Sequence, residues 1–230
     1  MMKADMILSN GTVITMNEDL EVFPQGAVVV KDGLIVAVGP VADLSGKYET
    51  EEIIDCTGQV IMPGLINAHT HVPMSLLRGL ADDLRLDVWL YGYMLPVERE
   101  FVDEEFCYYG TLLSCAEMIR SGVTCFADMY YFEDEVARAA QEAGMRAICA
   151  ETVMKLPTPD ATSYDESLEY CRRFIAGWKG HELIMPAVGP HSPSSSPPSY
   201  LSFSRIVATA LSVELVTVLK ESGKPICKPI

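Results

Sequence analysis

Hydrophobic and polar positions divide the chain into two regions with different periods. Residues 1–62 contain short runs rich in Val and Ile, separated by Asn10-Gly11, Asp32-Gly33 and Thr57-Gly58. Asn-Gly and Asp-Gly favour tight hairpin turns, because both turn positions need a positive φ. We therefore expect a small β-sandwich or meander, with strands over residues 4–8, 12–15, 26–31, 34–39 and 52–55.

From Val60 onward, strand-like runs alternate with helical spacing. The pattern predicts strands over residues 65–69, 123–128, 145–151 and 183–188, and helices over 74–80, 87–98, 103–121, 133–143 and 164–178. Strands that alternate with helices of 10–15 residues indicate βαβ units and a parallel sheet. After His191 a Ser/Pro-rich stretch reads as a loop, followed by a helix over 207–219 and the start of a fifth strand over 225–227.

Composition and charge narrow the range of partners. The 230 residues include 32 Asp and Glu against 17 Lys and Arg, a formal net charge of −15. Nucleic acids and anionic membrane surfaces would be repelled, so we expect neither as a partner. The seven cysteines are scattered and form no Cys-x-x-Cys pair, which favours reduced thiols in a cytoplasm. We expect no signal peptide or membrane span, because the amino terminus lacks an apolar core and no apolar run approaches about 18 residues.

The first candidate for chemistry is a pair of histidines. The chain has four His, and two of them form His69-Thr70-His71 at the end of the strand predicted over 65–69. Residues i and i+2 of a strand point to the same side, so this spacing aims two imidazoles at one point, which suits a metal ion. Spacing alone fits equally well with two polar residues that hydrogen-bond to their neighbours.

The residues around this pair resemble the amidohydrolase superfamily. Residues 62–71, Met-Pro-Gly-Leu-Ile-Asn-Ala-His-Thr-His, are similar to its first-strand signature. The stretch from Met74 to Glu98 resembles the branch that contains 5′-methylthioadenosine/S-adenosylhomocysteine deaminases and triazine chlorohydrolases. Residues 122–130 and 188–191 fit the same branch. The resemblance covers residues 1 to about 193.

This resemblance implies an α/β fold of TIM type, a (β/α)₈ barrel. A complete barrel takes roughly 250 residues, whereas the chain without its first segment has about 170. We therefore expect an incomplete barrel of about four to five βα units. The expected domains are an N-terminal β-sandwich segment over 1–62, the first half of a metal-dependent hydrolase barrel over 63–191, and a divergent tail over 192–230.

The resemblance also implies a reaction and roles for four residues. His69 and His71 would be ligands of one divalent metal, commonly zinc, that activates water for hydrolytic deamination of an adenosine-like purine. Glu98 would contact the ribose hydroxyls and His191 the substrate. Without the resemblance, Glu98 would be taken for a surface acid and His191 for a loop histidine. The partner is a small purine nucleoside, a homo-oligomer stays open, and hydrolysis of triazines, guanine or cytosine-like rings stays the alternative.

The sequence departs from the family pattern after His191. The family takes a His ligand and a catalytic Glu from its fifth strand, another His from its sixth and an Asp from its eighth. No His follows His191 here, Cys227 stands near the first expected position, and neither acid can be assigned.

Three hypotheses cover this departure. The chain is a truncated or frameshifted inactive form, a working half that completes its barrel with another chain, or a non-catalytic remnant that binds a ligand or partner. Residues 192–230 carry two acids and four bases, and this change of charge favours the first.

Overall fold

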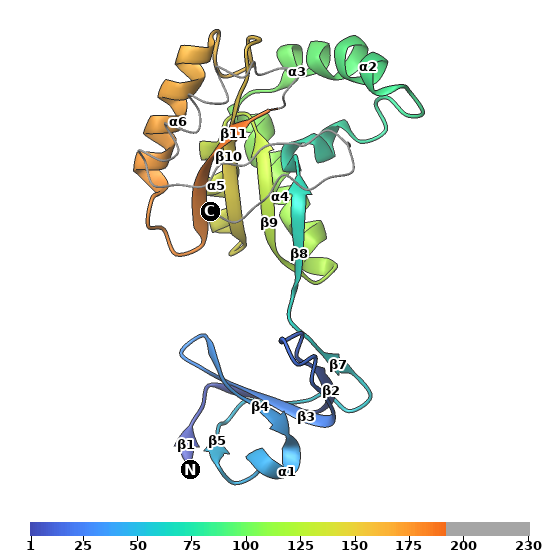
Figure 1. The fold of residues 1–230 in the computed structure, drawn as a ribbon, viewed down its shortest axis with the longest axis vertical. Helices are drawn as coiled ribbons and strands as arrows, with labels where there is room; N and C mark the ends of the chain where they lie inside the picture. The colour runs from blue at the N-terminus through green and yellow to red at the C-terminus, as the bar shows by residue number, and fades with distance from the viewer. Residues whose placement is uncertain (192–230) are drawn as a thin grey trace. The chain divides into compact units, whose positions relative to one another are not determined.

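The computed structural model describes residues 1–191, which belong to two compact units, Met1–Gly64 and the unit that begins at Leu65 (Figure 1). The helix predicted over 207–219, the strand predicted over 225–227 and the whole tail lie outside the described residues.

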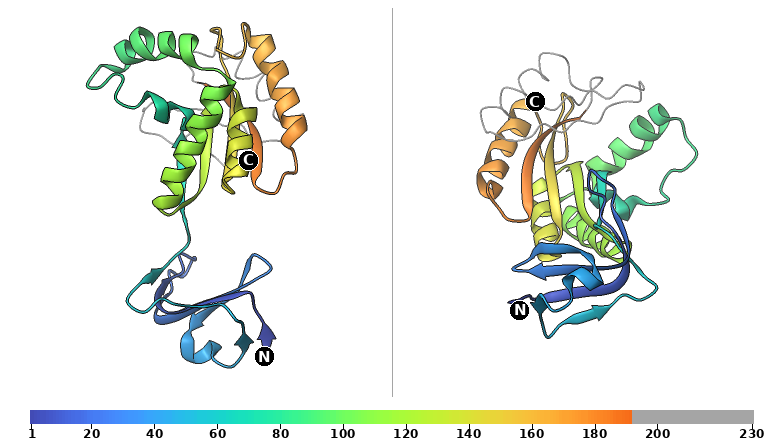
Figure 2. Two further views of the ribbon diagram at one scale, coloured as in Figure 1. Left: turned by 180° about the vertical axis from the view of Figure 1, so that it is seen from behind. Right: turned by 60° about the horizontal axis from the view of Figure 1, so that its bottom comes forward.

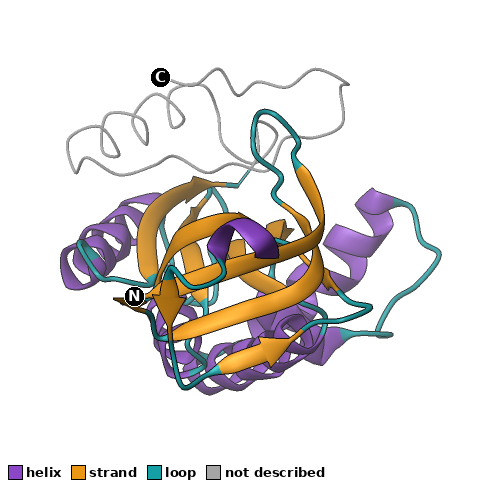
Figure 3. Cartoon of the chain, turned by 90° about the horizontal axis from the view of Figure 1, so that it is seen from below, coloured by secondary structure: helices purple, strands orange, loops and turns teal. Residues whose placement is uncertain are grey.

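The N-terminal unit is built from strands. A five-stranded sheet has the order β4-β3-β2-β6, with β7 also paired to β2, and a separate parallel pair joins β1 to β5. Figure 3 draws the strands in orange. The elements are β1 (Met2–Lys3), β2 (Met6–Ile14), β3 (Val22–Lys31), β4 (Leu34–Pro40), α1 (Val41–Leu44), β5 (Tyr48–Glu49), β6 (Ile53–Asp55) and β7 (Val60–Ile61). Val13, Ala27, Val28, Val29 and Cys56 are its buried apolar residues. The packing of these strands as a β-sandwich stays a prediction.

One of the predicted turns is present and another is wrong. Asp32 and Gly33 have φ of +51° and +72° and join β3 to β4 as a two-residue hairpin. Asn10 also has a positive φ, +66°, but it lies inside β2, where the pairing register shifts between Leu8 and Gly11. The two strands predicted over 4–8 and 12–15 are therefore one bulged strand. The left-handed conformation that Asn favours serves a bulge as well as a turn.

The second unit is an α/β structure. Its strands β8 (Leu65–Thr70), β9 (Val123–Tyr130), β10 (Arg146–Val153) and β11 (Ile184–Pro190) lie in sequence order in one sheet, and every neighbouring pair is parallel. Each strand lies within two residues of its predicted bounds. The carboxyl ends of all four strands therefore meet at one edge of the sheet, the edge at which barrel enzymes place their active sites.

Three helices cover one face of this sheet: α4 (Glu104–Arg120), α5 (Glu133–Glu142) and α6 (Tyr164–Trp178) (Figure 2). Asp103 caps α4, because its side chain accepts a hydrogen bond from Phe106 N. Gly122 and Gly144, both with positive φ, follow the ends of α4 and α5. The core between helices and sheet is apolar and includes Phe126, Val136, Ala147, Leu168, Phe174, Ile175 and Val188.

The long connection from β8 to α4 is helical but irregular. A 3₁₀ helix η1 (Val72–Leu77) is followed by α2 (Leu86–Val88), a π-helical segment η2 (Trp89–Met94) and α3 (Leu95–Phe101). The helix predicted over 74–80 is thus short and of 3₁₀ type, with Pro73 in its first turn and Gly79, at φ +80°, just beyond its end. Across residues 1–191, none of the helices is both long and apolar enough to cross a bilayer.

Candidate metal and substrate site

The two histidines of the His-x-His motif lie together at the carboxyl end of β8. Their ring centroids are 5.3 Å apart, with the ring planes at 78°. Thr70, between them, turns its hydroxyl to Asp128, so the two imidazoles point to the other side of the chain. Nδ1 of His71 lies 2.6 Å from the carbonyl oxygen of Met129. This contact requires a proton on Nδ1 and leaves Nε2 as the nitrogen that can bind a metal.

The imidazoles of His69 and His71 are suited to be two of the ligands of a zinc ion. Neutral imidazole nitrogens are ordinary zinc ligands, and the ring arrangement lets both serve one ion. Catalytic zinc normally takes three protein ligands. Within residues 1–191, no group of three or more His, Cys, Asp or Glu side chains has the geometry to hold a metal. The described residues therefore offer a partial site.

Asp128 on β9 fixes the backbone on both sides of His71. Its Oδ1 accepts one hydrogen bond from Thr70 Oγ1 at 2.5 Å and another from Val72 N at 2.7 Å. Asp128 is fully buried. No functional role was predicted for this residue from the sequence. Its place behind the histidine pair makes it a positioning group for that pair.

Glu98 lies in α3 and is buried, with only 5% of its surface exposed. Tyr130 Oη donates a hydrogen bond to Oε1 at 2.9 Å, and Tyr131 Oη approaches Oε2 at 3.4 Å. Burial raises the pKa of the Glu98 carboxyl, while the Tyr130 hydroxyl and nearby His71 oppose that rise. This burial excludes a surface acid, and the Tyr130 ring that hydrogen-bonds to Glu98 has its centroid 6.3 Å from that of His71.

His191 follows the end of β11, and its backbone N–H donates to the carbonyl of Val153 at 3.0 Å. Burial, with a smaller effect of His71, lowers the pKa of His191 to about 4. The imidazole is therefore neutral at pH 7 and offers one donor and one acceptor nitrogen. The four residues named from the sequence thus lie at one end of the sheet, around His71.

Two tyrosines and two carboxyls at this end were not identified from the sequence. Tyr130 and Tyr131 hydrogen-bond to Glu98, Glu133 is fully buried beside Asp128, and Glu151 is fully buried beside Asp160. Tyr130 belongs to the segment that carried the family resemblance, and Glu151 is an acid within an apolar strand. These two features could have identified Tyr130 and Glu151 as candidates, but neither feature predicts which residue each side chain contacts.

The buried carboxyls support the turn that follows β9. Glu133 Oε1 accepts from Tyr130 N at 2.7 Å, Glu151 Oε2 accepts from Glu133 N at 3.1 Å, and Asp160 Oδ2 accepts from Phe132 N at 2.8 Å. Burial raises the pKa of Glu133 and Glu151 well above the ordinary value, Asp128 adding to the first and Asp160 to the second. We infer protonated side chains at Glu133 and Glu151, because a proton on each gives the facing carboxylate a hydrogen bond.

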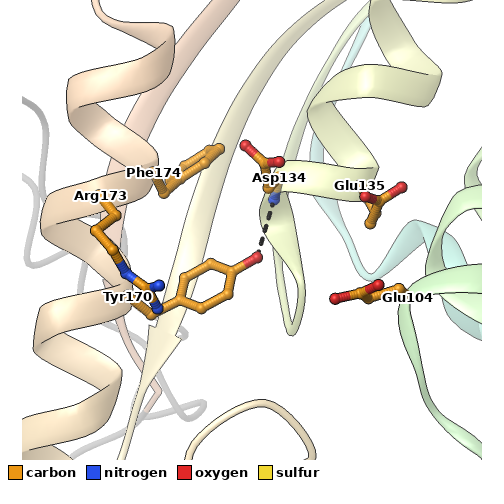
Figure 4. Close-up of a pocket in the computed structure, with 6 residues that line it drawn as sticks. All are labelled: Glu104, Asp134, Glu135, Tyr170, Arg173 and Phe174. Carbon is orange, nitrogen blue, oxygen red and sulfur yellow. Dashed lines mark hydrogen bonds between the residues drawn. The ribbon is translucent and has the colours of Figure 1, made fainter.

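The described part of this unit contains hollows, and two of them bear on the candidate site. One, of about 350 Å³, lies beside His71 and is lined by residues of β8, η1 and α4. The other, of about 260 Å³, lies among α4, α5 and α6 and is lined by Glu104, Asp134, Glu135, Tyr170, Arg173 and Phe174 (Figure 4). The second hollow contains no histidine and belongs to the helix layer, so it is separate from the candidate site.

Comparison with known proteins identifies relatives of the same kind. The model of the amidohydrolase family matches residues 60–225, and a model of the imidazolonepropionase-like composite domain of bacteria matches residues 26–48. The 5-methylthioadenosine/S-adenosylhomocysteine deaminase of Syntrophobacter fumaroxidans is 44% identical over 220 residues, which are 96% of this chain and 50% of that protein. The 5′-deoxyadenosine deaminase of Methanosarcina mazei is 40% identical over 201 residues, 86% of this chain and 45% of that protein.

A solved structure shows the same fold. An adenosine deaminase from Xanthomonas campestris with bound zinc superposes with a TM-score of 0.90 at 35% identity, over 94% of this chain and 49% of that one. The chain therefore spans about half the length of the relatives it matches.

Proposed function

Because the chain belongs to the amidohydrolase family, we propose that it carries the first part of the active site of a metal-dependent aminohydrolase. The reaction is hydrolytic deamination of an adenosine-like purine. The observation that carries this proposal is the arrangement around His71: a second imidazole with its centroid 5.3 Å away, and the Tyr130 ring 6.3 Å away, whose hydroxyl donates to the buried Glu98 carboxyl.

His69 and His71 are the proposed metal ligands. A bound zinc ion would supply a water of lowered pKa for attack on the ring carbon that carries the amino group. Asp128 keeps the two histidines in place through Thr70 and Val72. The carbonyl of Met129 keeps the proton of His71 on Nδ1, so the other nitrogen stays available.

Glu98 and His191 are the proposed substrate-binding residues. A carboxylate that already accepts a hydrogen bond from Tyr130 retains lone pairs for the two hydroxyls of a ribose. The neutral imidazole of His191 can donate to or accept from a purine nitrogen. The relatives named as methylthioadenosine/S-adenosylhomocysteine and 5′-deoxyadenosine deaminases support a nucleoside as substrate.

Turnover is proposed to need ligands beyond those that the 230 residues supply. The four histidines of the chain are His69, His71, His181 and His191. His181 lies in the turn before β11, where its Nδ1 accepts from Leu183 N and Ile184 N at 3.2 Å. We therefore place only His69 and His71 on the metal. We also propose a cytoplasmic location and no nucleic-acid partner.

A chimera tests this function. Residues 1–191 of this chain would be followed by the remaining half of the S. fumaroxidans relative, loaded with zinc and assayed for ammonia release from 5′-methylthioadenosine. We expect turnover that His69→Ala abolishes, and none from the 230 residues alone above a His69→Ala control. A chimera that folds, retains zinc and releases no ammonia would contradict the proposal.

A further inference from the structure

Tyr130 connects the two halves of the candidate site. Its hydroxyl donates to Glu98 Oε1 at 2.9 Å, and its ring centroid lies 6.3 Å from that of His71, with the planes at 39°. The Tyr130 side chain thus lies against both Glu98, the proposed substrate-binding carboxylate, and His71, a proposed metal ligand. Neither contact follows from the sequence, because Glu98 and Tyr130 are 32 residues apart.

Glu98 depends on neutral donors. The ion pairs within residues 1–191 join Arg78, Arg85, Arg138 and Arg172 to other acids, and none includes Glu98. The Tyr130 hydroxyl is the shorter of the two tyrosine contacts, 2.9 Å against 3.4 Å for Tyr131. Burial of Tyr130 raises the pKa of its phenol, so the hydroxyl keeps its proton and remains a donor. A charge-assisted hydrogen bond of this kind both orients a carboxylate and favours its ionised form.

The backbone at Tyr130 is held on several sides. Its N–H donates to the buried Glu133 carboxyl. Two residues on, Phe132 has a left-handed φ of +52° and donates its N–H to Asp160. A left-handed conformation in a bulky residue persists only where the surroundings determine it. The Tyr130 and Tyr131 rings also pack together, with centroids 4.8 Å apart. The direction of the Tyr130 hydroxyl is therefore fixed before any substrate arrives.

We propose that Tyr130 is a positioning residue for substrate selection, which holds the Glu98 carboxylate in the orientation that accepts a vicinal diol. The inference rests on the proposed function and assigns it a residue. It implies that removing the Tyr130 hydroxyl weakens the preference for a ribose-bearing ligand without releasing the metal.

The test compares two ligands on two variants. The full 230-residue chain is kept in buffer with a fixed excess of zinc and titrated by calorimetry with 5′-methylthioadenosine and with its 2′,3′-dideoxy analogue. Tyr130→Phe keeps the ring and removes the hydroxyl. Tyr108→Phe is the matched control, since Tyr108 Oη donates to Glu142 at 2.5 Å on the helix layer. We expect the preference for the diol ligand to fall about tenfold in Y130F and to stay unchanged in Y108F, with equal zinc content.

The outcomes separate the inference from the function. A Y130F chain that keeps the wild-type preference overturns the role of Tyr130 and leaves the proposed function standing. A wild-type chain that binds neither nucleoside overturns the proposed function, and the inference with it. A second readout needs no variant, in case Y130F fails to fold: the ¹³Cζ resonance of Tyr130 should shift when the diol ligand binds and stay in place with the dideoxy analogue. A resonance that is insensitive to the diol ligand also overturns the inference.

Discussion

At the scale of single residues, the site depends on buried carboxyls whose hydrogen bonds the sequence does not reveal. Asp128 is the clearest case, because its Oδ1 holds the chain on both sides of His71. Asp128→Ala leaves the buried Val72 N–H without a partner, which should cost about 1–3 kcal/mol of stability. It should also weaken zinc binding by about 10–100-fold, the usual effect of losing a group that supports a ligand.

The control for this prediction is another aspartate with a backbone partner. Asp103→Ala removes the cap of α4 and should cost about 1 kcal/mol of stability with no change in zinc affinity. Asp128→Asn keeps an acceptor for Val72 N and should recover most of the zinc affinity. Competition with a chromophoric chelator measures the zinc affinity. Equal affinity in Asp128→Ala and wild type would exclude the positioning role.

The raised pKa of Glu151 predicts that the stability of the chain depends on pH. Its pKa is raised by burial, and by Asp160 after burial, well above the ordinary value of 4.5. The folded chain therefore keeps a proton that the unfolded chain releases above about pH 4.5. The free energy of unfolding falls as the pH rises from about 4.5 toward the raised pKa of the folded chain. The slope from one such group is at most about 1.4 kcal/mol per pH unit.

Glu151→Gln mimics the protonated acid and should remove this slope. Its amide oxygen can accept from Glu133 N, and its NH₂ can donate to Asp160. We expect similar stability to wild type near pH 4.5 and higher stability than wild type at pH 8, measured by urea unfolding across that range. Glu182→Gln, at an exposed glutamate, should follow the wild type. Parallel wild-type and Glu151→Gln curves would show that Glu151 is ionised in the folded chain.

At the scale of elements, most of the second unit could be predicted because its local signals agree. Helix α6 has the bounds that the pattern predicts, Tyr164–Trp178, and α4, Glu104–Arg120, lies within the helix predicted over 103–121. The errors have two different local causes. Asn10 makes a bulge instead of a turn, and the segment after His71 forms a 3₁₀ helix because Pro73 and Gly79 limit its length.

The packing of α4 on η1 predicts that an alanine at Gly110 destabilises the chain, although helix propensity alone would predict stabilisation. A Cβ at Gly110 in α4 would lie 2.6 Å from the carbonyl oxygen of Pro73, whereas a Cβ at Gly177 in α6 would meet nothing within 4 Å. Alanine is the better helix former at both positions by about 1 kcal/mol. We expect Gly177→Ala to stabilise the chain by about 0.5–1 kcal/mol and Gly110→Ala to destabilise it by about 1–3 kcal/mol.

Thermal unfolding of the two glycine variants checks this difference. Because both substitutions add one methyl group to a helix, their opposite signs would isolate the contact with Pro73. Stabilisation by Gly110→Ala would mean that η1 can move away from α4 at little cost.

At the scale of the whole molecule, the sequence predicted which residues gather but not what holds them. His69, His71, Glu98 and His191 were named from a motif and a family resemblance, and the parallel strand order brings them to one end. The sequence did not predict the roles of Tyr130, Glu133 and Glu151, because a buried polar contact between distant segments has no period along the chain. Only the fold makes Glu98 and Tyr130 neighbours.

The ligand count of the molecule sets its affinity for zinc. The described residues bring two imidazoles to one point, and a third protein ligand is absent among them. A third ligand normally completes a catalytic zinc site. We therefore expect the 230-residue chain to bind less than one equivalent of zinc tightly and to lose it on dialysis against a chelator, as measured by atomic absorption. His71→Ala should lower the zinc content further, whereas His181→Ala should not, because His181 serves a turn. One equivalent retained through the dialysis, and lost in His71→Ala, would mean that another group of this chain completes the site.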